Sequence, residues 1–284
     1  MSKKVIIASD STTDLSHELI ERYGIKTLPL TVSLGSEHYR DGIDIDPDII
    51  YAHYEKTGEL PKTAAVNVNE FSDFFARETE NGNSVVLFTI SSNMSSTYNN
   101  ARLAASNYTD VYIVDTRNLS TGGGLLALAA CDMAEDGMAA NDIADACRAL
   151  TGRVDASFVV DDLEFLYKGG RCSALAALGA NLLSLKPCIG VVDGKMGVGK
   201  KYRGKFSITL KKYIDDQLKH IDEIDTSRIF ITHAGCDEAI VNACVEQVKA
   251  YGVFKEIHVT RAGCTISSHC GRNTLGVLFI RKAK

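Results

Sequence analysis

The sequence predicts an α/β protein with two α/β domains. Three observations predict this class. Apolar runs alternate with helix signals through the first half of the chain, which is typical of a mainly parallel sheet with flanking helices. In the second half, Asp193-Gly194 stands between two apolar runs, a strong hairpin signal that predicts a mixed sheet. The length of 284 residues is sufficient for two cores, with a tunnel between or beside them.

In the first half, helix starts are indicated by capping residues. Asp14 is expected to cap one helix, Asp46 followed by Pro47 begins a second, and Asn69 begins a third. A fourth helix is expected from about Ser95. The expected strands are 4–9, 25–34, 84–90 and 110–115, and the first three helices are 15–23, 48–57 and 70–80.

After residue 120 two consecutive helices are expected, and a second α/β unit then begins near residue 153. No proline- or serine-rich linker separates the units, so the predicted domains are 1–160 and 161–284. The expected helices of this half are 121–137, 141–152, 173–185 and 237–252, and its strands include 228–235, 255–261 and 274–280.

Composition excludes several kinds of partner. A net charge of −5 disfavours nucleic acid, because an acidic protein repels polyanions. The apolar run after Lys4 is too short for a signal peptide, and no run reaches transmembrane length, so we expect a cytoplasmic protein without stable membrane insertion. The eight cysteines are expected to be reduced, and none has the spacing of a zinc site.

Hydroxyl residues gather at two turns that follow strands. One turn is the segment 8–15; in the other, five of the seven residues from Ser91 to Thr97 carry hydroxyls. Ligands of open α/β sheets bind at such turns, where helix starts offer free backbone N–H groups to an anion. The alternative is simple N-capping, for which Ser, Thr and Asp are the preferred residues.

A carboxylate suits the second turn better than a phosphate. Phosphate-binding loops use several glycines and a lysine, and this turn has neither. A carboxylate spreads one charge over two oxygens, so two or three hydroxyl or amide donors can hold it.

Two segments are apolar nearly all round a helix, namely 122–130 and 173–185. Such helices are buried on most sides. They either pack at the centre of the fold or line a long apolar cavity, and the sequence leaves both interpretations open.

Two further groups of residues suggest chemistry. His269 lies in a polar stretch, read as a loop, ahead of the last strand, where it is either structural or the base for a nucleophile such as Ser95, Ser268 or Cys264. Basic residues also gather in and beside glycine-rich turns, where they either are solvated or meet a phosphate or an acidic partner. They are Arg171, Lys200, Lys201, Arg203 and Lys205.

Eight motifs, in order along nearly the whole chain, resemble those of the DegV family, bacterial fatty-acid-binding proteins that serve as the acyl-carrying subunit of fatty acid kinase. Any one motif is weak, but the ordered set is specific. They are DSTTDL at 10–15, PKT at 61–63, ISSNMSSTYNNA at 90–101, VDTRNLSTGGG at 114–124, LYKGGRCSALAALGANLLSLKP at 166–187, DGK at 193–195, HAG at 233–235 and SSHCGRNTLG at 267–276.

The resemblance implies a carrier without metal, cofactor or catalytic residue, which binds a long-chain fatty acid in a tunnel and presents it to the catalytic subunit of a fatty acid kinase. By position, the carboxylate would be held by Thr63, Ser95, Ser96 and His269. The tunnel would be lined by Leu175, Leu178 and Leu182, and the partner kinase would dock at Arg171 and Arg203.

The chain departs from the usual family pattern beside these positions, at Ala64, Val66, Ser96, Arg272 and Asn273. The departures border the expected head-group site and bear on acyl-chain specificity. Two other functions remain as alternatives. One is a hydrolase of acyl esters with a Ser/His or Cys/His pair, and the other is a sugar-phosphate or anion binding module.

Overall fold

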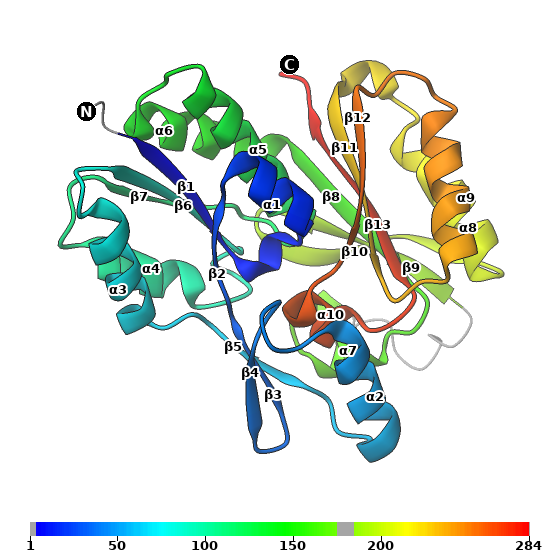
Figure 1. Cartoon of the computed structure of the whole chain (residues 1–284). Coiled ribbons are helices and arrows are strands. Elements are labelled where there is room, and N and C mark those ends of the chain that lie inside the picture. The colour runs from blue at the N-terminus through cyan, green and yellow to red at the C-terminus, as the bar shows by residue number, and fades with distance from the viewer. Residues whose placement is uncertain (1–3, 175–184, 284) are drawn as a thin grey trace.

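The computed structural model describes residues 4–174 and 185–283. Figure 1 shows the main layers side by side: helices, a parallel sheet, central helices, a mixed sheet and a last pair of helices. A small third sheet lies below these layers. The predicted combination of a mainly parallel and a mixed sheet with helices is confirmed.

The first sheet has four parallel strands in the order β2-β1-β6-β7. Its strands are short, and the apolar strand β6 is buried along its whole length, as expected for a strand covered on both faces. Helices α3 and α4 cover one face through an aromatic cluster that includes Phe71, Phe74 and Phe75. The elements are β1 (Val5–Asp10), β2 (Lys26–Leu28), β6 (Ser84–Thr89), β7 (Val111–Asp115), α3 (Val68–Thr79) and α4 (Thr97–Ala105).

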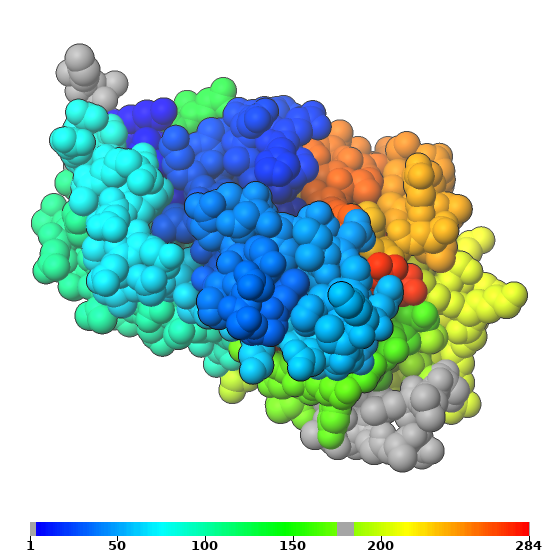
Figure 2. Space-filling view, turned by 60° about the horizontal axis from the view of Figure 1, so that its bottom comes forward, coloured from blue at the N-terminus to red at the C-terminus, as the bar shows by residue number. Residues whose placement is uncertain are grey.

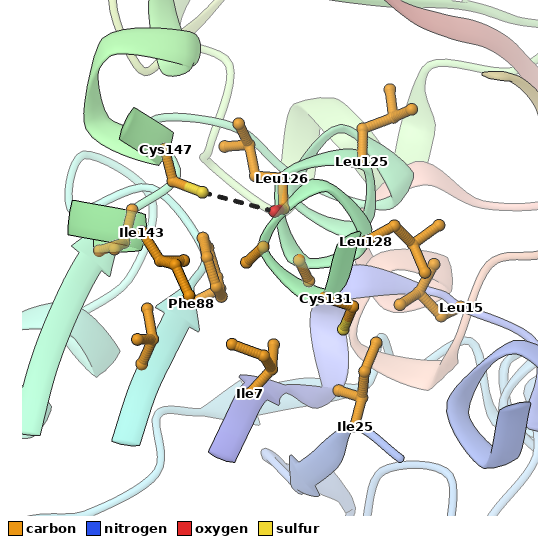
Figure 3. Packing of buried hydrophobic residues seen from close by; sticks show 14 of the residues in the cluster. Ile7, Leu15, Ile25, Phe88, Leu125, Leu126, Leu128, Cys131, Ile143 and Cys147 are labelled. Atoms are coloured by element: carbon orange, nitrogen blue, oxygen red, sulfur yellow. Dashed lines mark hydrogen bonds between the residues drawn. The ribbon is translucent and has the colours of Figure 1, made fainter. Parts of the chain in front are cut away.

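Helix α5 (Thr121–Glu135) lies between the two large sheets, and the hydrophobic cluster in which it packs contains residues of both sheets. Leu126 and Leu128 pack in one cluster with Phe88 of the first sheet and Phe230 of the second. Figure 3 shows α5 above the strand ends, with Leu126 beside Cys147 of α6. The segment 122–130 is therefore a central packing helix. Helix α1 (His17–Tyr23) and α6 (Ala140–Leu150) complete this layer.

The second sheet has six strands in the order β10-β9-β8-β13-β11-β12, antiparallel except for the pair β11–β12. The predicted hairpin at Asp193-Gly194 joins β9 and β10, and both turn residues have positive φ. Helices α8 and α9 cover the outer face. The elements are β8 (Val154–Val160), β9 (Leu185–Val192), β10 (Lys195–Arg203), β11 (Ile224–Ala234), β12 (Glu256–Arg261), β13 (Thr274–Arg281), α8 (Phe206–Gln217) and α9 (Glu238–Lys249).

The small sheet, β4-β3-β5, packs with three helices at the lower end of the molecule in Figure 1. In Figure 2 this end comes forward, and the blue residues of the small sheet and α2 lie beside green residues of the segment that contains α7. Tyr54 of α2 and Phe165 of α7 make an edge-to-face ring contact there. The elements are β3 (Thr31–Leu34), β4 (Glu37–Arg40), β5 (Lys62–Ala64), α2 (Pro47–Thr57), α7 (Glu164–Lys168) and α10 (Cys264–Cys270).

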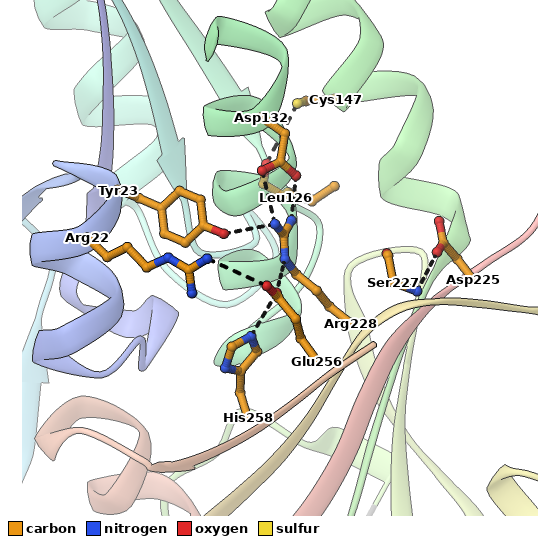
Figure 4. Close-up of polar contacts among 10 residues, drawn as sticks. All are labelled: Arg22, Tyr23, Leu126, Asp132, Cys147, Asp225, Ser227, Arg228, Glu256 and His258. Atoms are coloured by element: carbon orange, nitrogen blue, oxygen red, sulfur yellow. Dashed lines mark hydrogen bonds and ion pairs between the residues drawn. The ribbon is translucent and has the colours of Figure 1, made fainter. Parts of the chain in front are cut away.

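A half-buried arginine joins the central helices to the second sheet. Arg228 of β11 binds both carboxylate oxygens of Asp132 on α5, and it contacts Glu256 of β12 at 2.7 Å. It also donates to the Tyr23 hydroxyl of α1 at 2.9 Å (Figure 4). This Arg228 cluster connects two helices of one half, α1 and α5, to the edge of the sheet of the other half.

Some sequence predictions were wrong in detail. Ser16, not Asp14, caps α1, and Asn67, not Asn69, caps α3 through a capping box with Glu70. The segment predicted as one strand over 25–34 forms two strands in different sheets, since Pro29 interrupts it.

Other predictions held or remain predictions. The starts at Asp46-Pro47 and the stops at Gly24 and Gly58 are confirmed. The helix over 173–185 lies almost entirely outside the described residues, and Leu185 itself begins β9. The domain division at 160/161 stays a prediction; β8, which precedes it, pairs in the six-stranded sheet. Within the described chain, no helix is long and apolar enough to cross a membrane.

Candidate ligand-binding site

A hydrogen bond between Thr63 and His269 brings together two residues that are 206 positions apart. The Thr63 Oγ1 and His269 Nε2 atoms are 2.8 Å apart. Thr63 lies on β5 of the small sheet, and His269 lies on α10, so the stretch read as a loop is in fact a short helix. Both residues line the same cavity.

The His269 ring is kept neutral by its surroundings. Burial, helped by the positive charge of Arg171, lowers the pKa of His269 to about 4. Its Nδ1 atom is buried and has no partner among the described residues. At neutral pH the ring therefore acts as a hydrogen-bonding group and not as a fixed cation.

Both glycines of the KGG motif, Gly169 and Gly170, are required by the backbone near His269. A Cβ atom at this position would lie 2.7 Å from His269 Nδ1, which is too close for any side chain. Gly170 follows with a φ of +71°, a conformation that glycine adopts without strain. The pair thus lets the segment after α7 pass directly over the His269 ring.

Helix α10 is anchored by a carboxylate from a distant segment. Asp41, which follows β4, accepts hydrogen bonds from the backbone N–H groups of Cys264 and Thr265 at 2.7 and 3.1 Å. Asp14 accepts another from the N–H of Gly263 at 2.8 Å. These bonds satisfy the free donors at the start of the helix and fix its direction, and so the direction of His269.

The second hydroxyl-rich turn lies between β6 and α4 and is held in place by the β9–β10 hairpin. Ser91 donates to the carbonyl of Gly194 at 2.7 Å, and the amide of Asn93 donates to the carbonyl of Asp193. A Cβ atom at Gly194 would lie 2.7 Å from the Ser91 hydroxyl, so this approach needs a glycine. One half of the molecule thus holds the turn that the other half contributes.

The hydroxyls of this turn divide into structural and free ones. Ser91 binds the hairpin, and Ser95 accepts from the N–H of Thr97 at 3.2 Å, as a helix cap would. Ser95 Oγ also lies 2.8 Å from Thr97 Oγ1. Ser96, the N-cap residue, makes no capping bond through its side chain and is exposed. Ser95 and Ser96 both line the cavity.

The cavity has a volume of about 610 Å³, within the range of small-molecule sites. Its half-buried and exposed residues include the four predicted carboxylate ligands, and its buried residues are mainly apolar. The half-buried and exposed residues form an outer wall that suits a polar group of a ligand. The buried residues form an inner wall that suits an apolar group. The buried lining consists of Leu30, Ile90, Leu119, Met196, Thr265, Ile266 and Cys270.

The first hydroxyl-rich turn contributes none of the described lining residues, and its side chains bond one another and distant groups of the protein. Asp10 accepts from the N–H and hydroxyl of Thr12 and from the N–H of Ile90, 80 residues away. Burial raises the pKa of Asp10 to about 6 and that of Asp14 well above its usual value. The polar side chains of this turn therefore serve the structure, in agreement with the alternative that they are N-caps.

None of the three candidate nucleophiles is bonded to His269. Ser95 bonds Thr97, and Ser268 donates to the carbonyl of Cys264 at 2.7 Å. The Cys264 thiol donates to the carbonyl of Ile45, and burial raises its pKa, so it stays a thiol. A nucleophile activated by His269 would need a direct bond to the ring.

The basic residues fall in different places. Arg171 is exposed and lines the cavity, and its guanidinium donates to the carbonyl of Gly169. Arg203 is exposed at the end of β10. The tunnel residues Leu175, Leu178 and Leu182 lie outside the described residues.

Two of the positions expected to depart from the family pattern, Ala64 and Ser96, border the cavity. Ala64 lines the cavity, and Val66 is buried in the core of the first sheet. Arg272 stacks on the Tyr51 ring at 4.8 Å, and Asn273 adopts a positive φ. Arg272, two residues after the end of α10, thus covers the Tyr51 ring of α2.

Sequence reasoning missed Thr265 and most of the apolar lining, including Leu119 and Met196. These residues come from a loop, a strand and a helix that carry no common motif. A threonine four residues before His269 was the one available signal, because residues i and i+4 share a helix face.

Known proteins resemble this chain in both sequence and fold. The model of the family described as "Uncharacterised protein, DegV family COG1307" matches residues 4–282. The chain belongs to the DegV family. A DegV domain-containing protein of Clostridium perfringens is 31% identical to it over 291 residues, with 99% of each chain covered. One of Clostridium acetobutylicum is 30% identical, again with 99% of each chain covered.

Solved structures of DegV proteins share the fold. A fatty-acid-binding DegV family protein from Thermus thermophilus superposes with a TM-score of 0.88 at 29% identity, covering 98% of this chain and all of the other. A stearic-acid-binding protein from Eubacterium ventriosum has a TM-score of 0.83, also at 29% identity, with 97% and 98% covered.

Proposed function

We propose that the protein binds a long-chain fatty acid in the cavity and presents its carboxylate to a separate fatty acid kinase subunit. The observation that carries the proposal is the Thr63–His269 hydrogen bond at a cavity that Ser95 and Ser96 also line. Fatty-acid-binding relatives with the same fold support the ligand class.

In this proposal the head group is held by neutral donors. Thr63, Ser95, Ser96 and the neutral His269 ring offer hydrogen bonds to the two carboxylate oxygens. Each such bond is worth about 1–3 kcal/mol when a partner is removed. Their main effect is to orient the acid and to disfavour ligands without a carboxylate.

The acyl chain supplies most of the affinity. Burial of a methylene contributes about 0.8 kcal/mol, so roughly fourteen methylenes give on the order of 10 kcal/mol before the entropy of binding is subtracted. The apolar inner wall is suited to such a chain, and Leu175, Leu178 and Leu182 remain proposed members of the tunnel.

The kinase would reach the carboxylate from the outer wall. Ser96 is exposed and the other three head-group residues are partly so, which suits transfer of a phosphoryl group to the carboxylate by a partner. Arg171 and Arg203, both exposed, are the proposed docking residues.

The test is fatty acid binding measured by calorimetry with hexadecanoic acid. We expect Thr63→Val and Ser95→Ala each to weaken binding by about 1–3 kcal/mol while the thermal midpoint stays near that of the wild type. Ser106→Ala, which removes an exposed hydroxyl at the end of α4, is the matched control. Unchanged affinity in both site variants would contradict the head-group assignment.

Two further variants test presentation to a kinase. With a fatty acid kinase subunit and ATP, Arg171→Ala and Arg203→Ala should lose acyl phosphate formation. Arg203→Ala, outside the described cavity lining, should keep normal hexadecanoic acid affinity. Full phosphorylation with both variants would contradict the docking assignment and leave the binding result intact.

A further inference from the structure

Helix α10 carries three buried hydroxyls besides the His269 ring, and they behave differently. Ser267 donates to the carbonyl of Ala262 at 3.1 Å, and Ser268 donates to that of Cys264 at 2.7 Å. Such bonds to the preceding turn are the usual way in which a helix satisfies a buried hydroxyl. Thr265 Oγ1 makes no such bond, and it has no partner in the described part of the chain.

Thr265 is also the one of these three residues that lines the cavity. The Thr265 side chain lines the cavity, whereas Ser267 and Ser268 are absent from the described lining. Thr265 is 4% exposed, so its hydroxyl has little access to bulk solvent. A buried hydroxyl without a partner destabilises the protein, and a ligand that bonds this hydroxyl would recover the lost free energy.

The position of Thr265 places this hydroxyl beyond the head group. Thr265 and His269 are four residues apart on one helix face, about 6 Å along the axis. His269 is partly exposed, and Thr265 is buried beside Ile266. An acid whose carboxylate lies at His269 and whose chain runs inward therefore passes Thr265 within its first few carbons.

We propose that Thr265 is a specificity residue that hydrogen-bonds an oxygen on the acyl chain, so that the cavity favours fatty acids hydroxylated close to the carboxylate. The inference rests on the proposed fatty acid function and adds a substrate class to it. The rest of the buried lining, which includes Ile90, Leu119 and Ile266, is apolar and leaves the selection to this single hydroxyl.

The experiment compares ligands in pairs. Affinities are measured by calorimetry for hexadecanoic acid, for its β-, γ- and δ-hydroxy derivatives, and for the ω-hydroxy derivative as a ligand control. The variant is Thr265→Val, which keeps the shape and removes the hydroxyl. Thr265→Ser keeps the hydroxyl, and Ser268→Ala removes a neighbouring buried hydroxyl outside the described lining.

We expect at least one of the β-, γ- and δ-hydroxy acids to bind the wild type more tightly than hexadecanoic acid. Thr265→Val should reduce that preference about five- to tenfold and leave hexadecanoic acid affinity equal or higher. Thr265→Ser and Ser268→Ala should keep the preference, and thermal melting checks that every variant is folded.

Three results would overturn the inference. If Thr265→Val weakens all ligands equally, Thr265 binds the carboxylate and not the chain. If the preference is absent or unchanged in the variant while hexadecanoic acid still binds, Thr265 plays no part in selection and the proposed function stands. Failure of the wild type to bind hexadecanoic acid at all would instead remove the proposed function and this inference together.

Discussion

The two halves of the molecule meet in two joints of opposite character. In the apolar joint, Leu126 and Leu128 of α5 pack between Phe88 of one sheet and Phe230 of the other. In the aspartate joint, the buried carboxylates of Asp14 and Asp41 accept hydrogen bonds from backbone N–H groups of the other half, those of Gly263, Cys264 and Thr265. The neighbouring buried carboxylate of Asp10 accepts from Thr12 and Ile90 of its own half.

The difference shows that the apolar joint supplies stability, whereas the aspartate joint orients the site. Apolar packing is non-directional and independent of pH, so the apolar joint holds the halves together without specifying one side-chain geometry at the site. Hydrogen bonds are directional, and Asp41 and Asp14 aim α10 and therefore His269. In this joint, burial raises the pKa values of Asp10 and Asp14, which costs stability at neutral pH.

The largest expected effect comes from the apolar joint. Leu126→Ala removes a fully buried side chain from the centre of the shared core and should lower the free energy of unfolding by about 2–5 kcal/mol. Urea unfolding at pH 5 and pH 7 measures this, and the loss should be equal at both. Leu103→Ala, at an exposed leucine on α4, should change it by less than about 0.5 kcal/mol. A loss that depends strongly on pH would break the comparison.

The next effect is a change in pH dependence at the aspartate joint. The pKa of Asp10 is raised from 3.8 to about 6, so the folded state binds more protons than the unfolded state between these values. Stability due to this group therefore falls as pH rises from about 4 to 6, by roughly 3 kcal/mol, and is constant above.

Asp10→Asn should remove this contribution and flatten the pH profile of unfolding in that window. Urea unfolding at several pH values checks it. Asp44→Asn is the control, because the pKa of the exposed Asp44 carboxyl is lowered by Arg40 and its effect falls below the window. The same slope in Asp10→Asn and the wild type would show that Asp10 does not titrate in the folded protein as described.

The smallest effect is expected in the Arg228 cluster. Tyr23→Phe removes one hydroxyl that accepts from Arg228 and should cost about 0.5–1.5 kcal/mol. The loss should be the same at pH 5 and pH 7, because the neighbouring carboxylates raise the pKa of Arg228 and keep it charged. Tyr167→Phe, at an exposed tyrosine, is the control. A pH-dependent loss would show that polar contacts in general, and not buried carboxyls, give the molecule its pH sensitivity.

The sequence by itself determined the order and type of most elements. Local signals act over a few residues, so they can be recognised from the sequence alone. They include the alternating apolar runs, the helix start at Asp46-Pro47 and the helix stops at Gly24 and Gly58. The Asp193-Gly194 turn was legible for the same reason. The family motifs, read in order, also indicated the ligand class.

Only the tertiary structure decided which residues meet. Thr63 contacts His269 across 206 positions, and Asp41 anchors α10 across more than 220, through contacts that no local pattern records. Pro29 interrupts the segment 25–34, but which sheet each part joins depends on its strand partners, β1 for Lys26–Leu28 and β5 for Thr31–Leu34. The unbonded hydroxyl of Thr265 likewise depends on what surrounds it in space, because a threonine in sequence looks the same whether its hydroxyl is satisfied or free.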